Sequence, residues 1–439
     1  MSTALPLANA LVAQQFGQQA GELHIGGVGV HALVAAHGSP LYVMDKYILQ
    51  QRHAALRAAL AGFAEVYYSI KANPQPAVAR VFVEAGSGLE IASGGEFLLA
   101  KAAGCAPEHM LFAGPGKGED ELRLVMSEGI GDIHLECFEE VAVAGRLAAE
   151  LGRVQPVALR INPSAAAQGG AMRMGGKPAA FGFDEEQMAQ AVQAVLAWPG
   201  LRLDGIHLFA GTQVLQAEVL LQQWRLGLGL ASQLAQLLGR PLQRIDLGGG
   251  LGIPYHPGQA TLDLDAVAQG VPALQQLQRD DPWLQGSGVL VEPGRWLSGP
   301  AGVYLMRVRA VKQSRGQRFV ICDGGMHHHL AASGNLGQVI KLDYPLVAAS
   351  RMDDTELAPA QVVGPLCTPL DTLGRLAQLP VATQAGDVLA VLQSGAYGLS
   401  ASPVGFLSHA MPAEVMVADG QHQRVRAAGS FAEPLVNLM

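Results

Sequence analysis

The hydrophobic positions of this chain alternate between two spacings over most of its length. Short apolar runs rich in β-formers occupy residues 66–70, 89–92, 110–113, 133–136, 157–161, 203–209, 244–247 and 289–291. Segments with apolar residues at helical spacing lie between them, at 76–85, 95–103, 119–128, 140–151, 185–197 and 215–238. Eight strands that alternate with helices predict a (β/α)8 barrel of the TIM type, an α/β fold.

The pattern changes after residue 299. Short alternating strands separated by turn residues follow at 303–311, 318–322, 361–363, 388–392 and 413–417, which predicts a C-terminal all-β domain, a β-barrel or sandwich. An early strand within residues 21–44 is expected to pair with it. We therefore predict a barrel domain at 40–299 and a β domain made of 1–39 together with 300–439.

Composition and charge narrow the function classes. The 439 residues are 49% hydrophobic and 15% charged, which fits a large core and two domains. The net charge is −8 and no basic run appears, so we expect no nucleic-acid partner. The sequence contains no run of ~18 strongly apolar residues, so we expect no membrane span. Its first residues lack the pattern of a secretory signal. The four cysteines form no CxxC pair, which favours a reducing cytoplasm.

Polar residues lie where the predicted barrel strands end, the place where barrels of this type carry chemistry. These are Lys71, Glu90, Arg160, His207 and Glu292. Lys71 follows the apolar run 66–70, and Asn73-Pro74 ends that strand. One interpretation is a surface lysine just past a strand end. The other is a Schiff-base lysine that holds an aldehyde cofactor.

Two further segments admit two interpretations each. The turn Gly248, Gly249 and Gly250 is either only a tight turn or a cradle of backbone amides for a phosphate. Glu292, three residues before Arg295, is either an exposed residue with a local ion pair or a carboxylate aimed at a ring nitrogen.

Three segments of the predicted β domain carry reactive or aromatic side chains. Cys367 is either a small hydrophobe or a reactive thiol. Three consecutive histidines, His327 to His329, suggest substrate contacts or loop packing, because neighbouring residues of an extended segment point in alternating directions and a metal site is not expected. The glycine-flanked Tyr397 either packs or reaches a phosphate.

An ordered set of motifs covers the chain from about residue 40 to about residue 417. They are Tyr-Tyr-Ser-Ile-Lys-Ala-Asn, Glu-Ile-Ala-Ser-Gly-Gly-Glu, His-Leu-Phe-Ala-Gly-Thr-Gln, Asp-Leu-Gly-Gly-Gly, Glu-Pro-Gly-Arg, Gly-Pro-Leu-Cys and Gly-Ala-Tyr. In this order they resemble the fold-type III pyridoxal-phosphate decarboxylases, the family of diaminopimelate and ornithine decarboxylases.

The resemblance implies a cofactor, a partner subunit and a set of site residues. It implies pyridoxal 5'-phosphate on Lys71, with Glu292 at its ring nitrogen. It implies Cys367 entering from the other subunit of a head-to-tail homodimer, with Asp371 beside it in the loop. The other implied cofactor contacts are Glu90, Glu96, Arg160, His207, Phe209, Thr212, Gly248, Gly249, Gly250, Gly294, Arg295 and Tyr397.

The departures from the family pattern concern the substrate. Phe209 stands where the family usually has a second histidine that stacks on the cofactor. Thr368 replaces the acid that reads a distal amine, and a neutral threonine cannot pair with an ammonium. His327 and His328 begin a segment that replaces the usual substrate-binding residues.

These substitutions are similar to a narrower branch, which includes the butirosin-pathway decarboxylase of L-glutamyl groups on an acyl-carrier protein and decarboxylases associated with exosortase gene clusters. The segment 173–178, with two positive charges, is similar to that branch too.

The resemblance implies α-decarboxylation of an L-amino acid or of an aminoacyl group tethered to a carrier protein, through an external aldimine and a quinonoid. Cys367, or alternatively Lys71, then returns a proton to Cα. Three alternatives stay open: a decarboxylase of a free diamino acid, an amino-acid racemase on the same barrel, and a non-catalytic protein that binds the cofactor. Glu292 argues against the racemase, which is expected to hold the ring nitrogen with arginine.

Overall fold

The computed structural model describes residues 4–164, 172–173, 178–209, 211–336 and 341–436. The chain divides into two compact units. The barrel unit consists of Gln51–Ile253 and Ala260–Trp296, and the β unit consists of Met1–Gln50, Pro254–Gln259 and Leu297–Met439. Each unit is described by itself below.

Eight parallel strands close the barrel, as the hydrophobic pattern predicted. Each pairs with its neighbours in the order β5, β6, β7, β8, β9, β12, β14, β15, and β15 pairs with β5. Their bounds are Glu65–Ser69, Gly88–Ile91, Met110–Phe112, Asp132–Leu135, Gln155–Asn162, Leu201–Leu208, Arg244–Asp246 and Gly288–Val291. Strands buried on both faces need apolar side chains on both, which explains their Val, Ile and Leu content.

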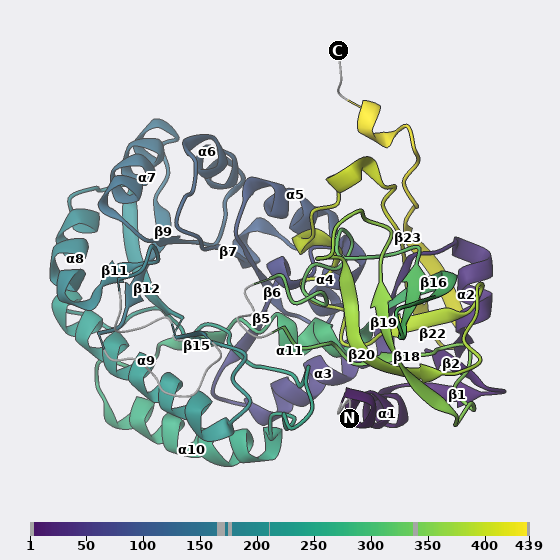
Figure 1. The fold of residues 1–439 in the computed structure, drawn as a ribbon. Helices are drawn as coiled ribbons and strands as arrows, with labels where there is room; N and C mark the ends of the chain where they lie inside the picture. The colour runs from purple at the N-terminus through teal and green to yellow at the C-terminus, as the bar shows by residue number, and fades with distance from the viewer. Residues whose placement is uncertain (1–3, 165–171, 174–177, 210, 337–340, 437–439) are drawn as a thin grey trace. The chain divides into compact units, whose positions relative to one another are not determined.

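Helices lie outside the ring of strands (Figure 1). They are α4 Pro76–Glu84, α5 Gly94–Ala102, α6 Glu119–Glu128, α7 Phe138–Glu150, α8 Met188–Leu196, α9 Ala217–Leu238 and α10 Leu264–Asp280. Local signals set their ends: the side chain of Ser93 caps α5 by accepting the Glu96 N–H, and α9 ends at Gly239, whose φ of +76° suits glycine.

The β unit is built on a mixed sheet. Its strand order is β20, β19, β17, β16, β4, β22, β23, with β21 paired to β16 and to β18. The bounds are β4 Leu41–Asp45, β16 Gly302–Ser314, β17 Gln317–Cys322, β18 Leu346–Val347, β19 Leu357–Val363, β20 Thr372–Pro380, β21 Val388–Val391, β22 Ala413–Ala418 and β23 Gln421–Arg426. The early strand β4 pairs antiparallel with β16 and parallel with β22.

Several elements were not predicted from the sequence. Strands β20 and β23 alternate weakly, and β23 is exposed along most of its length, so no apolar period marks it. The helices α1 Ala4–Gln15, α2 Val30–His37 and α3 Lys46–Ala59 flank three short strands, β1 Gly17–Gln19, β2 Glu22–Ile25 and β3 Val28–Gly29. Among these, the apolar spacing of the sequence predicts α3, as a helix at 47–60, and β2, as a short strand at 21–26.

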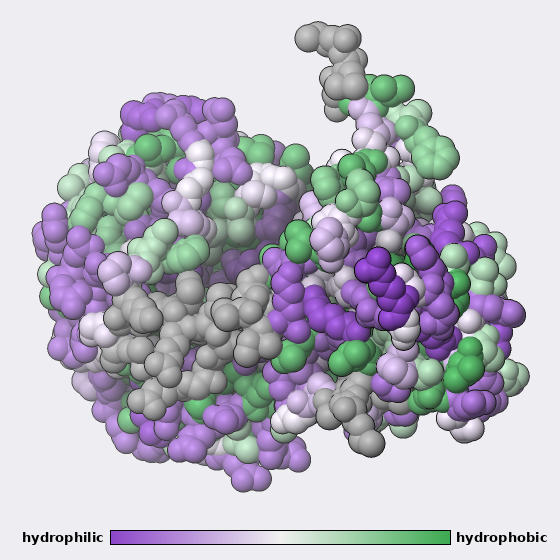
Figure 2. All heavy atoms as spheres, in the orientation of Figure 1, coloured by the Kyte–Doolittle hydropathy of each residue, from purple (hydrophilic) through white to green (hydrophobic). Residues whose placement is uncertain are grey.

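Hydrophilic side chains cover much of the outer surface over α7 and α8 in the face that Figure 2 shows. Among the described residues, no helix has the length and apolarity needed to cross a membrane.

Candidate functional site

Lys71 lies directly after strand β5, in the short 3-10 helix Ile70–Ala72. Its Nζ is 3.0 Å from Oε1 and 3.1 Å from Oε2 of Glu90, the partner residue on β6. The Lys71 side chain is 43% exposed whereas that of Glu90 is 1% exposed, so a buried carboxylate holds an accessible amine. The Ser69 hydroxyl donates a further hydrogen bond to Glu90. The Lys71 amine is therefore held by a carboxylate at the carboxyl end of the barrel, unlike a surface lysine that only follows a strand end.

Glu292 follows strand β15 and is 4% exposed. This burial excludes the interpretation of an exposed turn. Its Oε2 atom lies 3.3 Å from Nε2 of His207, so the structure brings two of the predicted residues together. Among the described residues, its Oε1 atom has no hydrogen-bond partner. A buried carboxylate oxygen without a donor is costly, and a protonated ring nitrogen is the kind of donor that it lacks.

Two residues that were not predicted as site residues complete this cluster. His134 on β8 and Asp246 on β14 are buried beside His207 and Glu292, and one polar atom of each of these side chains lies within 4.8 Å of the others. The rings of His134 and His207 are tilted against each other with centroids 4.6 Å apart. A partial signal existed in the sequence, because His134 and Glu136 alternate with apolar residues along the predicted strand 133–136.

Burial dominates the protonation of this cluster. Desolvation is the main cause that lowers the pKa of both imidazoles, His134 and His207, well below the usual range. The second cause is the charge of Arg160 for His207 and the neighbouring His207 ring for His134. Desolvation and the neighbouring Glu292 carboxylate raise the pKa of Asp246 well above its usual range. Both imidazoles are therefore neutral at physiological pH.

Arg160, at the end of β9, is held by a carboxylate that the sequence analysis missed. Its Nη1 donates to Oε1 of Glu136 at 2.8 Å, and the same carboxylate accepts the backbone N–H of Gly114 at 2.6 Å and of Gly182 at 3.1 Å. The Arg160 guanidinium also lies 4.9 Å from the centroid of the Phe181 ring. This clamp fixes a cation at the rim of the barrel.

The glycine turn after β14 has no room for side chains. A Cβ on Gly248, Gly249 or Gly250 would meet the backbone oxygen of Leu208, Glu292 or Gly211, respectively. Gly248 and Gly250 also have φ values of +69° and +97°. Asp246 Oδ1 accepts the Gly248 N–H at 2.8 Å. The packing alone requires glycine here, and the bare backbone that results suits the approach of a phosphate.

The other predicted barrel residues lie around this turn. Thr212 ends the short strand β13 Gly211–Thr212, which pairs with β10 Met172–Arg173, and Phe209 directly follows β12. Gly294 packs closely on Ser69 and Ala72, and Arg295 begins the short helix α11 Arg295–Ser298. Within the predicted segment 173–178, residues 174–177 lie outside the described residues.

The remaining predicted residues belong to the β unit. Cys367 is exposed on the loop between β19 and β20. Asp371, at the end of that loop, is buried and accepts the backbone N–H groups of Met326 and Leu366 at 2.6 and 2.9 Å. Asp371 thus ties the cysteine loop to the start of the histidine segment. Tyr397 adopts a left-handed φ of +53°, which is uncommon for a residue with a side chain.

The three histidines are buried and differ in their contacts. His328 Nε2 lies 3.1 Å from the Ala410 carbonyl oxygen, and His329 Nε2 lies 3.0 Å from Oγ of Ser394. Both ring nitrogens of His327 lack a partner among the residues described, and its ring is tilted by 41° against that of His328, with 3.8 Å between the centroids. Burial lowers the pKa of His327 to about 4 and those of His328 and His329 to about 3.

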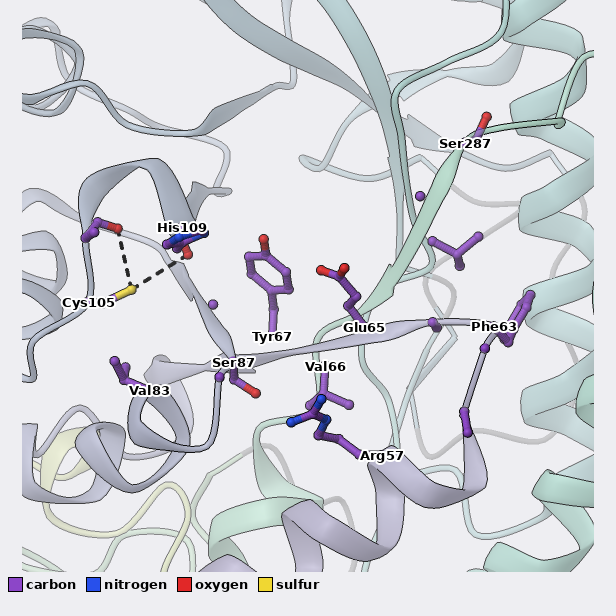
Figure 3. A pocket seen from close by; sticks show the side chains of 18 of the residues that line it. Arg57, Phe63, Glu65, Val66, Tyr67, Val83, Ser87, Cys105, His109 and Ser287 are labelled. Atoms are coloured by element: carbon purple, nitrogen blue, oxygen red, sulfur yellow. Dashed lines mark hydrogen bonds between the residues drawn. The ribbon is translucent and has the colours of Figure 1, made fainter.

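A pocket of about 1020 Å³ opens at the opposite end of the barrel strands. Figure 3 shows Glu65 and Tyr67 of β5 projecting toward it, with Ser87 and Cys105 on its wall. Burial raises the pKa of the Cys105 thiol to about 12, so this thiol is not a nucleophile. Catalysis in barrels of this type occurs at the carboxyl ends of the strands, so we place no catalytic step in this pocket.

Comparison with known proteins agrees with this geometry. Residues 47–299 match the family described as pyridoxal-dependent decarboxylase, pyridoxal binding domain. The chain is 36% identical over 404 residues to the L-glutamyl-[BtrI acyl-carrier protein] decarboxylase of Niallia circulans, covering 91% of this chain and 94% of that protein. It is 31% identical over 412 residues to the diaminopimelate decarboxylase of Aquifex aeolicus, covering 94% of each.

Solved structures share the fold. The structure of AQ1208 from Aquifex aeolicus matches with a TM-score of 0.85 and 28% identity, covering 98% of this chain and all of that one. The diaminopimelate decarboxylase of M. jannaschii in complex with L-lysine matches with a TM-score of 0.89 over 97% and 98% of the two chains, at 24% identity. The strand order, the lysine and carboxylate at the strand ends, and these matches together show that the chain belongs to the pyridoxal-dependent decarboxylases.

Proposed function

We propose that this enzyme removes the α-carboxylate of an aminoacyl group tethered to a carrier protein, with a free L-amino acid as the other substrate form. The observation that carries the assignment of the site is the buried Oε1 atom of Glu292, which lacks a hydrogen-bond partner among the described residues. A pyridinium N–H would supply that missing donor, and it would also explain why a carboxylate, which is costly to bury, lies directly after β15 with 4% exposure.

The residues of the barrel unit fit pyridoxal phosphate. The Lys71 amine would hold its aldehyde carbon, and the backbone N–H groups of Gly248 to Gly250 would take its phosphate, together with Thr212 and Arg295. When bound, the cofactor supplies a ring that takes up the electron pair left as the carboxylate departs as carbon dioxide.

The side chains have distinct tasks in this proposal. Glu90 accepts hydrogen bonds from Lys71 and so orients the amine. Glu292 would hold the proton on the ring nitrogen of a bound cofactor, which would make the ring a stronger electron acceptor. The phenyl ring of Phe209, directly after β12, would pack on one face of the cofactor ring and has no proton to donate.

We assign the proton that returns to Cα to the thiol of Cys367, supplied by the second subunit of a homodimer. Two observations support this proposal: the thiol is exposed on its loop, and Asp371 holds that loop by accepting the N–H of Leu366, the residue before Cys367. An exposed thiol has access to a neighbouring subunit, whereas Cys105 and Cys322 are buried.

Because all four cysteines are free thiols, we also propose the reducing cytoplasm as the compartment.

Whether the substrate is tethered or free is inferred from Thr368, on the loop that also carries Cys367. Thr368 cannot pair with the distal ammonium of a diamino acid, and the relative at 36% identity acts by its name on an L-glutamyl group carried by an acyl-carrier protein. The diaminopimelate decarboxylases among the relatives support the second candidate, a free diamino acid.

The test measures carbon dioxide release from free amino acids and from aminoacyl carrier proteins, with wild-type protein and Lys71→Ala. We expect release from the L-glutamyl carrier protein, and loss of both activity and the absorbance of lysine-bound cofactor in Lys71→Ala. Preferential release from diaminopimelate would favour the second candidate. Cofactor absorbance that is unchanged in Lys71→Ala, or an inverted product without carbon dioxide, would refute the assignment.

A further inference from the structure

Two carboxylates lie side by side at the centre of the barrel unit, where only one is needed for a ring nitrogen. Asp246 ends strand β14 and Glu292 follows strand β15, its neighbour in the sheet. They are 1% and 4% exposed. One carboxyl oxygen of each lies within 4.8 Å of the other, and Oδ2 of Asp246 and Oε1 of Glu292 both lack a hydrogen-bond partner among the described residues. Two ionised carboxylates have no hydrogen atom between them, so this contact is a hydrogen bond only when one of them carries a proton.

The contacts of the two groups differ. Asp246 Oδ1 accepts the Gly248 N–H at 2.8 Å, but its Oδ2 has no partner among the described residues other than this carboxyl contact. Glu292 faces Nε2 of His207 at 3.3 Å. The imidazole of His207 lies closer to Glu292 than the imidazole of His134 lies to Asp246, whose Oδ2 is 3.9 Å from Nδ1 of His134, and this difference places the negative charge on Glu292.

The surrounding charges do not neutralise a doubly ionised pair. Glu90 adds a further negative charge to the environment of Asp246. The nearest cations have partners of their own: Lys71 pairs with Glu90, and Arg160 pairs with Glu136. Lys117, which also acts on this cluster, pairs with Glu140 at 3.0 Å. His134 and His207 are neutral, Tyr67 lies near enough to interact with Asp246, and Arg244 at the other end of β14 pairs with Asp132 at 3.4 Å.

The geometry points to a shared proton: Asp246 is a protonated acid that donates a hydrogen bond to Glu292, so the pair carries a single negative charge, located on Glu292. Two like charges that share a buried site cannot both be ionised without a cation between them. Asp246 is in this sense a positioning residue that acts on the cofactor through Glu292. This inference depends on the proposed function in one respect only, namely that Glu292 faces the ring nitrogen of the cofactor.

The arrangement has a chemical consequence for the cofactor. One negative charge on Glu292 matches the one positive charge of a protonated ring nitrogen. The Asp246 O–H would supply one donor to the Glu292 carboxylate, whose two oxygens accept more than one hydrogen bond, so a ring nitrogen would still find an acceptor there. A doubly charged pair would instead bind any divalent cation that entered the cofactor-free barrel, since imidazole and carboxylate are both good ligands.

Infrared spectroscopy detects the carbonyl stretch of a protonated carboxylic acid, and it does so in cofactor-free and in loaded protein alike. The measurement is made at about pH 9, where Glu96 and Asp132, whose pKa values burial raises to about 7, are ionised. We expect a carboxylic-acid band in the wild type that shifts when aspartate carries ¹³C in its side-chain carboxyl group, and not when glutamate does. This arm uses the unmutated protein and needs no folding of a variant.

Asp246→Asn is the matched variant, because its amide keeps both contacts: the oxygen accepts the Gly248 N–H and the NH2 group donates to Glu292. We expect it to lose the band while a ¹⁵N-labelled cofactor keeps a protonated ring nitrogen. Asp246→Ala has no such donor, and we expect cofactor affinity at least about tenfold weaker than in Asp246→Asn. Glu292→Gln, by contrast, should lose the ring proton.

Four results would overturn the proposal: no carboxylic-acid band in the wild type, a band that follows labelled glutamate, a ring nitrogen that loses its proton in Asp246→Asn, or one divalent metal ion per purified chain. Because the band is measured in cofactor-free protein, it is independent of whether the enzyme proves to be a decarboxylase of the proposed substrate.

Discussion

Replacing Glu292 with glutamine removes one negative charge from the barrel interior and changes almost nothing in shape. Glutamine has the same length, and its amide still faces Nε2 of His207, which lies 3.3 Å from the carboxylate. What is lost is the negative charge that stabilises a proton on the ring nitrogen, because the amide oxygen of glutamine accepts a hydrogen bond but is neutral. We expect both cofactor affinity and turnover to fall, and turnover to fall further.

The magnitude follows from the burial of the group. Glu292 is 4% exposed, so its interaction with a ring cation is little screened by water. A hydrogen bond to a charged group contributes about 1.5–3 kcal/mol, which corresponds to cofactor binding about ten- to a hundredfold weaker. Turnover loses this amount and also the electron-withdrawing power of the protonated ring, so we expect a decrease of more than about a hundredfold in kcat.

The assay combines a fluorescence titration of the cofactor-free protein with pyridoxal phosphate and a measurement of carbon dioxide release at saturating cofactor. Glu84→Gln is the matched control, since Glu84 is an exposed glutamate at the end of α4 in the same unit. The control should bind and turn over like the wild type. If Glu292→Gln retains wild-type kcat at saturating cofactor, then Glu292 does not hold the ring nitrogen and the orientation proposed for the cofactor is wrong.

Three further predictions concern other parts of the site. Cys367→Ala should slow turnover at least about tenfold while cofactor affinity changes less than twofold; equal rates of product formation would rule out the thiol as the proton donor. Burial raises the pKa of Glu96 to about 7, so the protonated form stabilises the fold, and this contribution is lost as pH rises through 7. Glu96→Gln should therefore be more stable than the wild type in urea at about pH 8, by about 1–2 kcal/mol, and equal to it at about pH 4; equal stability at both pH values would contradict this. Gly249→Ala should cost about 1–3 kcal/mol and weaken cofactor binding, because a Cβ meets the backbone oxygen of Glu292, whereas Gly229→Ala in α9 has open space and should be neutral or stabilising; two variants of equal stability would show that the turn relaxes.

The sequence alone was sufficient for the barrel and for the end of it at which the candidate residues lie. Eight buried strands separated by helical periods leave few other folds, because parallel strands need helices on their outer face. Polar residues such as Lys71, Glu90 and Glu292 then had to lie at strand ends, where the buried apolar run stops. Their family motifs are short and local, so they could be recognised without knowing which strands are neighbours.

The tertiary structure decided which of these residues meet, and in what protonation state. His134, His207, Asp246 and Glu292 lie on or next to four different strands, and only closure of the barrel at one register brings them together. Their pKa values follow from desolvation inside the closed barrel and from each other's charges, neither of which a linear pattern contains. For the same reason Glu136, the partner of Arg160, could not be assigned from sequence: its role depends on a contact between β8 and β9 and not on its neighbours in the chain.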